Sequence, residues 1–383
     1  HKYLADSLRI AFVSDAAYPW NVGGLELVES IEARELAKRH EVHFFSFRWP
    51  GMKEEFRSNG ITYHTFHEIT KEKFYRHGRR SIREAIAFGI GIFALFGYKF
   101  DLVYANEFPV LHLPVIKLYC MLTGAKLVLD VVEVWDRNYW VSYLGPVAGS
   151  LASAYASTFI TSGDSYIANS TSTAKGLEGM GIPSGKIHVF SPIIDDRQMA
   201  RIRARQTNTI IFSGRLIKEK RVDRLIDVVK SVSRTVKGLK VLIIGEGPEA
   251  ANIKKQIRQL KLDSVVKMRG FYSEKGKANL YRDIKGAKML LHMSEREGLG
   301  IIALESLALG TPVVLPSYSP IPDEVKRMCV VADETALPAK VIEILRARDK
   351  GAYLRNGETL KNFYASNVNK FYSDMFKELG LIE

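Results

Sequence analysis

Two glutamates, Glu297 and Glu305, lie eight residues apart within residues 294–314, SEREGLGIIALESLALGTPVV. Gly298 and Gly300 leave backbone N–H groups unshielded beside the start of the following helix, and such groups form a site for phosphate. Ionised carboxylates only accept hydrogen bonds, so two acids beside that site suit sugar hydroxyls as partners. The alternative is a solvated acid in a loop and a surface glutamate on a helix, because a Glu-x7-Glu spacing alone is common.

A pair of cations follows a predicted strand in residues 213–221, SGRLIKEKR. Gly214 permits a tight exit from the strand, and Arg215 and Lys220 then lie five residues apart before the next helix. A guanidinium fork and an ammonium point charge can together neutralise the oxygens of a diphosphate. The alternative is that both cations face water, as most lysines do.

A glycine pair, Gly23 and Gly24, lies in the loop between the first predicted strand and the first predicted helix. This loop is not the G-x-G-x-x-G fingerprint, and the next strand ends in FFSFRW without an acid for a ribose. NAD binding is therefore disfavoured, whereas a close backbone approach to a phosphate or a sugar remains open.

Two alternations of strands and helices must position these residues. Strands that alternate with helices predict βαβ units, parallel sheets covered on both faces and an α/β fold. The expected strands are 8–13, 42–47, 102–104, 127–132 and 166–168, then 209–213, 240–244, 265–268, 289–292 and 313–315; expected helices include 25–38, 221–236, 249–260 and 301–309.

A chain of 383 residues is too long for one compact core, so we expect two domains. The polar, Arg-rich segment 191–208 is the expected boundary, which gives domains of 1–195 and 196–359. Aromatic residues recur at helical spacing within 360–381. They predict a terminal helix, and we assign 360–383 to the first domain.

The net charge of +13 arises entirely in the second half of the chain. Residues 1–195 hold 20 Lys or Arg against 20 Asp or Glu, whereas residues 196–383 hold 35 against 22. Such an excess can attract nucleic acid, an anionic membrane or a phosphorylated small molecule, and the charge alone does not distinguish among these three partners. The two cysteines argue against a disulfide framework and for a cytosolic setting. No signal peptide or membrane span is expected.

Taken together, the motifs resemble the retaining glycosyltransferases of family 4. The resemblance rests on the order and spacing of GG-x-E after the first strand, SGRL-x3-K, IIGEGP and E-G-x-G-x3-LE-x-LA-x-G-x-PVV. It implies the GT-B fold, in which two Rossmann-like parallel-sheet domains face each other across a cleft. It also implies a nucleotide-sugar donor, UDP- or GDP-linked, as a substrate and no separate cofactor.

The resemblance implies a role for each matching position. Arg215 and Lys220 match the cations that neutralise the donor diphosphate, and Glu297 matches the acid that holds the donor sugar. Glu305 matches the acid that bonds the ribose, and Gly24 matches a loop residue that approaches the diphosphate from the other domain. The remaining donor-binding positions that it implies are Gly214, Gly245, Glu246, Arg269, Gly270, Gly298, Leu299 and Gly300.

The first half departs from the family pattern at LVLDVVEVWD. Val132 stands where many relatives have a basic residue, and Glu133 takes the acid position before Trp135. Glu133 and Trp135 are therefore the candidate acceptor contacts. Simple packing at a strand end is the alternative for Trp135.

Residues 71–97 combine a basic, aromatic stretch, KEKFYRHGRRSIR, with the apolar run AIAFGIGIFALFG. The apolar run is too short to span a bilayer. One interpretation is peripheral contact with the inner face of a membrane, where a lipid acceptor would be found. The other, which we favour, is a buried helix of the first domain.

These expectations combine into a cytoplasmic enzyme that moves a sugar onto a glycan or a lipid-linked acceptor. The sequence contains no Asp-x-Asp, so we expect catalysis without a metal. The alternatives are another GT-B enzyme, such as a nucleotide-sugar epimerase, and a basic nucleic-acid-binding protein. The second is disfavoured because the cations of the second half are scattered along helices.

Overall fold

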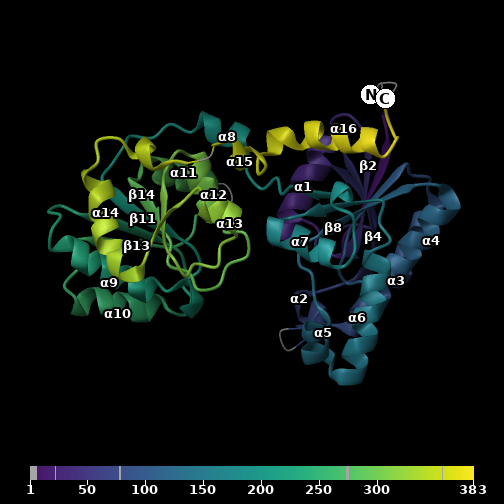
Figure 1. The fold of residues 1–383 in the computed structure, drawn as a ribbon, viewed down its shortest axis with the longest axis horizontal. Coiled ribbons are helices and arrows are strands. Elements are labelled where there is room, and N and C mark those ends of the chain that lie inside the picture. Colours follow the sequence, from purple (N-terminus) through teal and green to yellow (C-terminus); the bar gives the residue numbers. More distant parts are fainter. Residues whose placement is uncertain (1–6, 22, 77–78, 273–275, 356) are drawn as a thin grey trace. The chain divides into compact units, whose positions relative to one another are not determined.

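The chain forms two compact units in the computed structural model, which describes residues 7–21, 23–76, 79–272, 276–355 and 357–383 (Figure 1). Unit 1 comprises His1–Ile193 and Ala365–Glu383, and unit 2 comprises Ile194–Tyr364. The chain thus passes from one unit to the other twice, within a few residues of the expected boundaries at 195 and 360.

Unit 1 is built on an eight-stranded sheet with the order β10-β9-β8-β7-β1-β2-β4-β3. Each described pair of neighbours in this sheet is parallel except β3 with β4. The strands are β1 Arg9–Val13, β2 Glu41–Arg48, β3 Glu55–Ser58, β4 Ile61–Glu68, β7 Leu102–Asn106, β8 Lys126–Val131, β9 Ser165–Ala168 and β10 Ile187–Val189. A separate short ladder pairs β5 Tyr75–Arg76 with β6 Arg79–Arg80.

Helices cover this sheet because its central strands are apolar on both faces. The helices of unit 1 include α1 Gly24–Leu36, α2 Lys71–Phe74, α3 Ile82–Gly91, the 3-10 helix η1 Ile92–Gly97, α4 Leu113–Thr123, α5 Arg137–Leu144, α6 Pro146–Ile160, α7 Thr171–Gly179 and α16 Val368–Glu378.

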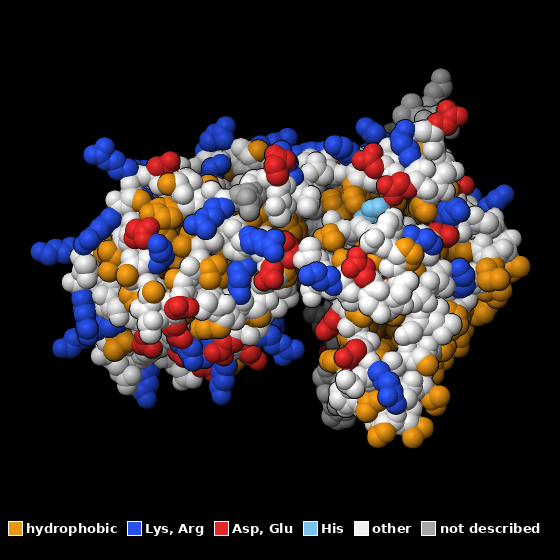
Figure 2. Space-filling model, viewed as in Figure 1, with side chains coloured by type: hydrophobic (Ala, Val, Ile, Leu, Met, Phe, Trp, Pro, Cys, Tyr) orange, Lys and Arg blue, Asp and Glu red, His pale blue; other side chains and the backbone are white. Residues whose placement is uncertain are grey.

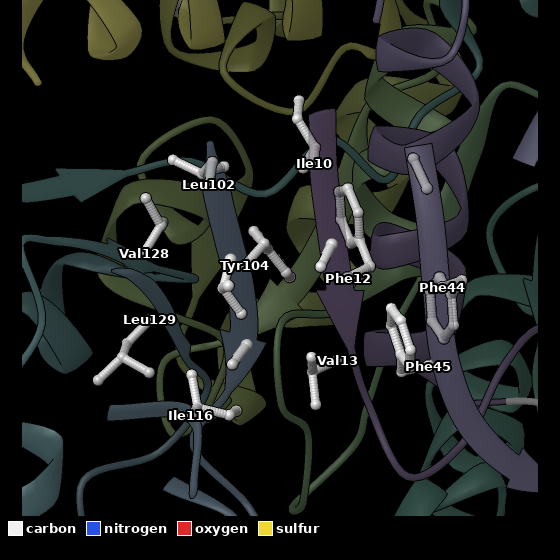
Figure 3. Close-up of a cluster of buried hydrophobic side chains, with 14 of the residues drawn as sticks. Ile10, Phe12, Val13, Phe44, Phe45, Leu102, Tyr104, Ile116, Val128 and Leu129 are labelled. Atoms are coloured by element: carbon white, nitrogen blue, oxygen red, sulfur yellow. The ribbon is translucent and has the colours of Figure 1, made fainter. Parts of the chain in front are cut away.

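The core of unit 1 lies along the strands β2, β1, β7 and β8 (Figure 3). Phe12 on β1 and Tyr104 on β7 are fully buried, with ring centroids 4.4 Å apart. Figure 3 labels the side chains of Ile10, Phe12, Val13, Phe44, Phe45, Leu102, Tyr104, Ile116, Val128 and Leu129.

The C-terminal helix α16 belongs to unit 1, where it packs against α1 (Figure 1). The Asn369 side chain donates to the Glu35 carbonyl oxygen at 3.2 Å. The ring of Phe371 stacks on that of Phe190 at 3.9 Å, and Tyr372 is fully buried. The expected terminal helix is therefore present, but it begins at Val368, after the short elements α15 Gly357–Lys361 and η7 Ala365–Asn367.

Unit 2 holds a six-stranded parallel sheet with the order β13-β12-β11-β14-β15-β16. Its strands are β11 Thr209–Ser213, β12 Lys240–Ile244, β13 Val266–Arg269, β14 Met289–Leu291, β15 Val313–Pro316 and β16 Val330–Ala332. Its helices include α8 Asp196–Arg201, η3 Lys218–Lys220, α9 Val222–Ser233, α10 Ala250–Gln259, α11 Lys277–Gly286, α12 Ile301–Ala308, α13 Asp323–Lys326 and α14 Leu337–Arg346.

Each of the two large sheets has one point at which the chain stops adding strands on one side and begins to add them on the other. In unit 1 the chain places β2, β3 and β4 on one side of β1 and then β7, β8, β9 and β10 on the other side, so the reversal lies between β1 and β7. In unit 2 the reversal lies between β11 and β14. In open α/β sheets, ligands bind outside the carboxyl ends of the strands at such a switch point.

The expectation that the apolar run of residues 85–97 is a buried helix is wrong for about half of its side chains. Phe88, Ile92 and Leu95 are buried, but Ile86, Ile90, Phe93 and Phe96 are exposed. The helix is amphipathic because it covers the sheet with one side only. Residues 77–78 of the preceding basic stretch lie outside the described residues. Within the described part of the chain, no helix is long and apolar enough to cross a membrane.

Candidate active site

The loop after β11 carries the predicted cations and packs backbone to backbone against the loop after β12. The Gly214 N–H donates to the Ile244 carbonyl oxygen at 3.0 Å, and the Leu216 N–H donates to the Glu246 carbonyl oxygen at 2.8 Å. A Cβ atom on Gly245 would lie 1.9 Å from the Gly214 carbonyl oxygen, which leaves no room for a side chain. Glycine at position 245 is therefore required for the two loops to meet.

The loop after β14 is tied to the same region. The Glu295 N–H donates to the Glu219 carbonyl oxygen at 2.8 Å, and the Ser294 hydroxyl donates to the same oxygen at 3.1 Å. This contact brings Glu297 to Lys220, 77 residues earlier, and their side chains form an ion pair. Both residues lie beside the switch point of unit 2, because β11 and β14 flank it.

Glu297 is ionised in this setting. Burial of its carboxyl group raises the pKa, but the hydrogen bonds and electrostatic attraction from His292 and Lys220 outweigh burial and lower the pKa to about 2. The His292 Nε2 atom lies 2.9 Å from Glu297 Oε1. The carboxylate thus holds the Lys220 ammonium at the edge of the sheet, where a diphosphate could meet it.

Arg215 is exposed and forms no hydrogen bond or ion pair with the residues that the structure describes. Its guanidinium is therefore available to an anion. Arg221, by contrast, is paired with Asp223 and Glu295. The Arg221 network borders a cavity of about 510 Å³ to which none of the predicted site residues contributes.

Glu305 lies inside α12 and is buried, with 7% of its surface exposed. Its Oε1 atom accepts a hydrogen bond from the Tyr281 hydroxyl at 2.7 Å and lies 3.8 Å from Lys277 Nζ. Gly300, the residue before α12, has a φ of +75°, in the left-handed region that favours glycine. The loop can therefore turn into the helix with its first backbone N–H groups uncovered.

The end of β13 carries the predicted residues Arg269 and Gly270. The Arg269 guanidinium lies 3.7 Å from the centroid of the Tyr272 ring. A Cβ atom on Gly270 would lie 2.3 Å from Glu246 Oε1, so the missing side chain leaves space for the Glu246 carboxyl group. Glu246 and Gly270, predicted separately, are thus neighbours.

In unit 1, Gly24 is the first residue of α1. Glu133 is exposed, and its N–H donates to Glu107 Oε1 at 3.2 Å. Trp135 lies in an aromatic cluster, with its ring centroid 4.4 Å from that of Tyr139. The structure therefore shows the packing expected as the alternative for Trp135, and it leaves an acceptor contact open, since both Glu133 and Trp135 line a large cavity.

This cavity measures about 850 Å³ and opens at the carboxyl ends of β7 and β8. Its lining is mainly apolar and aromatic: Leu25, Ile82, Phe108, Val110, Trp135, Tyr139, Trp140, Tyr143, Leu151 and Tyr155 are among the residues. Glu107, a residue that the sequence motifs did not reveal, is fully buried in its wall. Burial and the nearby Asp130 raise the pKa of Glu107 to about 8.

Two residues of the site were not predicted from the sequence, although the position of each in the sequence pointed to a ligand site. His292 directly follows β14, and Glu107 directly follows β7. Polar residues at the carboxyl ends of buried parallel strands point to a ligand site. Glu107 Oε2 and Trp135 Nε1 are buried without a hydrogen-bond partner among the described residues. Unpaired buried polar atoms are costly, so these two suit a bound polar group.

Comparison with known protein families decides what kind of enzyme this is. Residues 22–198 match the family model described as Glycosyltransferase Family 4, and residues 195–357 match that described as Glycosyl transferases group 1. The chain belongs to glycosyltransferase family 4. The resemblance of the sequence motifs to family 4 is thereby confirmed as to the family, and so is the prediction that this chain is a transferase.

Individual relatives of this family 4 glycosyltransferase are distant. N-acetyl-alpha-D-glucosaminyl L-malate synthase of Bacillus anthracis is 23% identical over 354 residues, 86% of each chain. A GDP-mannose-dependent alpha-(1-6)-phosphatidylinositol dimannoside mannosyltransferase of Mycobacterium tuberculosis is 32% identical over 128 residues, 32% of each chain.

Solved structures share the GT-B fold of this glycosyltransferase. HepE of Anabaena in complex with UDP has a TM-score of 0.69 at 14% identity, covering 97% of this chain and 100% of that one. The lipopolysaccharide outer core galactosyltransferase WaaB has a TM-score of 0.66 at 19% identity, with the same coverage. The two parallel-sheet units and these likenesses confirm the predicted fold class.

Proposed function

We propose that this glycosyltransferase moves a sugar from a nucleotide-diphosphate sugar to an acceptor hydroxyl, with retention of configuration and without a metal. The observation that carries the proposal is the contact of Lys220, Glu297 and His292 at the switch point of unit 2. It supports a site that holds an ammonium group where a diphosphate would bind. HepE was solved with UDP, which favours a nucleotide-diphosphate donor.

In the proposed reaction the anomeric C–O bond to the donor diphosphate breaks, and its electron pair stays on the phosphate oxygen. The acceptor oxygen bonds to the anomeric carbon on the same face, and its proton passes to the departing phosphate. Arg215, Lys220 and the backbone N–H groups before α12 stabilise the growing negative charge, which is commonly the largest catalytic contribution. Glu297 binds donor sugar hydroxyls, and Glu305 binds the ribose.

The acceptor would enter unit 1 at the cavity beside Glu133 and Trp135. Its hydroxyl belongs to a glycan or to a lipid-linked molecule. The relative from Mycobacterium tuberculosis is named for a phosphatidylinositol dimannoside, which is a lipid-linked acceptor. The mainly apolar lining of the cavity supports the same class.

The donor class can be tested by thermal shift with UDP-, GDP- and ADP-sugars, since a ligand at 100 times its Kd adds roughly 2.7 kcal/mol to stability. Arg215→Ala should lower turnover by about 100-fold or more, as the loss of one oxyanion donor does. Lys218→Ala is the matched control, because Lys218 is exposed and lies close in sequence.

Near-normal turnover in Arg215→Ala would contradict the proposal that Arg215 stabilises the charge on the departing phosphate. Metal-independent transfer predicts equal rates with and without EDTA, so a loss that Mg²⁺ or Mn²⁺ restores would contradict it. Conversion of the donor sugar without any acceptor would instead indicate an epimerase. Inversion of the product's anomeric configuration, measured by NMR, would contradict retention.

A further inference from the structure

Unit 1 exposes a set of large apolar side chains on neighbouring helices. Met121 and Val147 are 73% and 76% exposed. We call the set the apolar face: Ile82, Ile86 and Ile90 on α3, Phe93 and Phe96 on η1, Leu118, Met121 and Leu122 on α4, and Val147 and Leu151 on α6. Scattered exposed apolar residues are normal, but a contiguous group marks a binding surface.

The helices of the apolar face are in contact with one another. The ring of Phe96 on η1 lies 5.4 Å from that of Tyr119 on α4. Lys117 on α4 donates to the carbonyl oxygen of Ser162, just after α6, at 2.7 Å. Figure 1 shows α4, α3 and α6 along one side of unit 1, and Figure 2 shows hydrophobic side chains gathered along the same side.

The apolar face exposes no acid. The charged residues of α3, η1, α4 and α6 are Arg83, Glu84 and Lys117. Glu84 is buried and pairs with His67 at 2.8 Å, so the accessible charge is positive. Residues 1–195 as a whole contain as many acids as cations, so this local absence of acids is not a consequence of composition.

The cavity of unit 1 opens beside the apolar face, because the two share walls. Ile82 and Ala85 of α3 line it, as do Leu151 and Ala152 of α6. From there the cavity reaches Glu107 at the carboxyl end of β7. An amphiphile could therefore enter from the side of the apolar face and bring its polar end to the end of the sheet.

We infer that the apolar face docks on an anionic lipid bilayer and that the acceptor is an amphiphile of that bilayer, its apolar chain lying in the cavity. The inference rests on the proposed transfer reaction, since it names the class of its acceptor. Apolar side chains insert into the interface of a bilayer, and cations beside them are attracted to anionic headgroups. A two-fold dimer through this face would instead bring cations such as Arg83 of both copies to one interface.

The first experiment measures co-sedimentation of the full chain with vesicles. Binding is expected to phosphatidylglycerol/phosphatidylcholine vesicles and to be several-fold weaker with pure phosphatidylcholine, since each cation near the surface contributes roughly fivefold. Met121→Gln/Leu122→Gln should lower the partition coefficient by about tenfold or more, because one buried apolar side chain is worth about that factor. Val331→Gln is the matched control, since Val331 is an exposed apolar residue of unit 2.

The second experiment tests the cavity with phosphatidylcholine carrying brominated chains, mixed with phosphatidylglycerol. Trp135 and Trp140 line the cavity, so their fluorescence should be quenched on binding. Trp135→Phe/Trp140→Phe should remove the quenched component, because the two remaining tryptophans, Trp20 and Trp49, pack in or against the core of unit 1 and do not line the cavity. Vesicle binding without quenching would contradict the proposal that the apolar chain of the acceptor lies in the cavity.

Absence of vesicle binding, or equal binding of the Met121→Gln/Leu122→Gln variant, would overturn the docking surface. A dimer in sedimentation-velocity experiments that this variant dissociates would also overturn it, in favour of a second copy of the chain. Thermal shift by nucleotide-sugars measures the proposed function separately. A donor response without vesicle binding would therefore refute this inference and leave the proposed function standing.

Discussion

Replacement of Lys220 by methionine should weaken both the stability of unit 2 and catalysis. A pKa near 2 for Glu297, instead of the ordinary 4.5, corresponds to about 3 kcal/mol in favour of the ionised carboxylate. His292 and Lys220 share this stabilisation, so loss of Lys220 should cost about 1–2 kcal/mol. Both partners of the ion pair are mostly buried, with side-chain exposures of 16% and 13%, so solvent screens it little.

The sign of the pH dependence follows from the lowered pKa. Glu297 contributes its full stabilisation above its unfolded pKa, near 4.5, and loses it as the pH falls towards 2. The difference between wild type and Lys220→Met should therefore be largest at neutral pH and shrink below pH 4.5. Turnover at neutral pH should fall by about 100-fold, as for the loss of one oxyanion donor.

The assay can separate the two units, because all four tryptophans, Trp20, Trp49, Trp135 and Trp140, lie in unit 1. Urea unfolding followed by circular dichroism reports both units, whereas tryptophan fluorescence reports unit 1. Lys220→Met should lower the urea midpoint of the unfolding seen by circular dichroism and leave the midpoint seen by tryptophan fluorescence unchanged. The matched control Lys218→Met, at an exposed position of the same 3-10 helix, should shift neither.

A double-mutant cycle distinguishes a structural ion pair from a catalytic cation. Lys220→Met/Glu297→Gln should be more stable than the sum of the two single changes predicts, because it leaves no unpaired buried charge. Turnover should stay low in the double variant, since the positive charge for the diphosphate is still missing. Additive losses of stability would refute the coupling that we derive from the structure, and restored turnover would refute the catalytic role of Lys220.

Two further predictions concern residues that are buried. Gly245→Ala should destabilise unit 2 by about 1–3 kcal/mol through overpacking against the Gly214 carbonyl oxygen, measured by thermal unfolding. Gly179→Ala, where an added Cβ meets no atom within 4 Å, should be silent, and equal melting temperatures for the two variants would contradict the packing argument. Glu107→Gln should be neutral near pH 4 and stabilising at pH 9 in tryptophan-monitored unfolding. Its pKa is raised to about 8, so wild-type stability falls as the pH rises from about 4.5 through 8; a difference independent of pH would disprove this.

The order of strands and helices could be predicted because parallel strands buried on both faces form apolar runs with glycine loops after them. The strands around Ile10, Ile211 and Val314 are of this kind. The hairpin β3–β4 was missed because its sequence, EFRSNGITYHTFHE, is rich in polar residues on an edge of the sheet.

Burial of charged groups could not be predicted from the same patterns. Glu29 and Glu32 lie on α1 and are fully buried, although acids on a helix usually face water. Burial, and secondarily the negative charge of Asp130, raises the pKa of both well above the ordinary value, so protonated carboxyl groups can occupy the interior. The Tyr104 hydroxyl lies 2.9 Å from Glu32 Oε2 and 2.7 Å from an Asp130 oxygen, contacts between residues far apart in sequence.

The contact between Lys220 and Glu297 was within reach of sequence reasoning, because both follow strands that flank a switch point. The partner His292 was not, since a histidine after a strand is as often a packed residue as a ligand. The extent of the apolar face could not be predicted from the sequence either. It depends on which sides of α4 and α6 meet the sheet. α6 has no charged residue that would mark its solvent side, and α4 has only Lys117.

The return of the last helix to unit 1 limits how enzymes of this architecture can exchange their donor-binding halves. A single genetic crossover near residue 194 would import α16 with the foreign half, and rings such as Phe371 and Tyr372 would then meet a surface for which they were not selected. Two crossovers, near residues 194 and 364, would leave α16 in place. The ends of the exchanged cassette are already joined, since the Ile194 N–H donates to the Phe363 carbonyl oxygen at 2.8 Å. Chimeras built in this way should retain the acceptor specificity of one parent and take the donor specificity of the other.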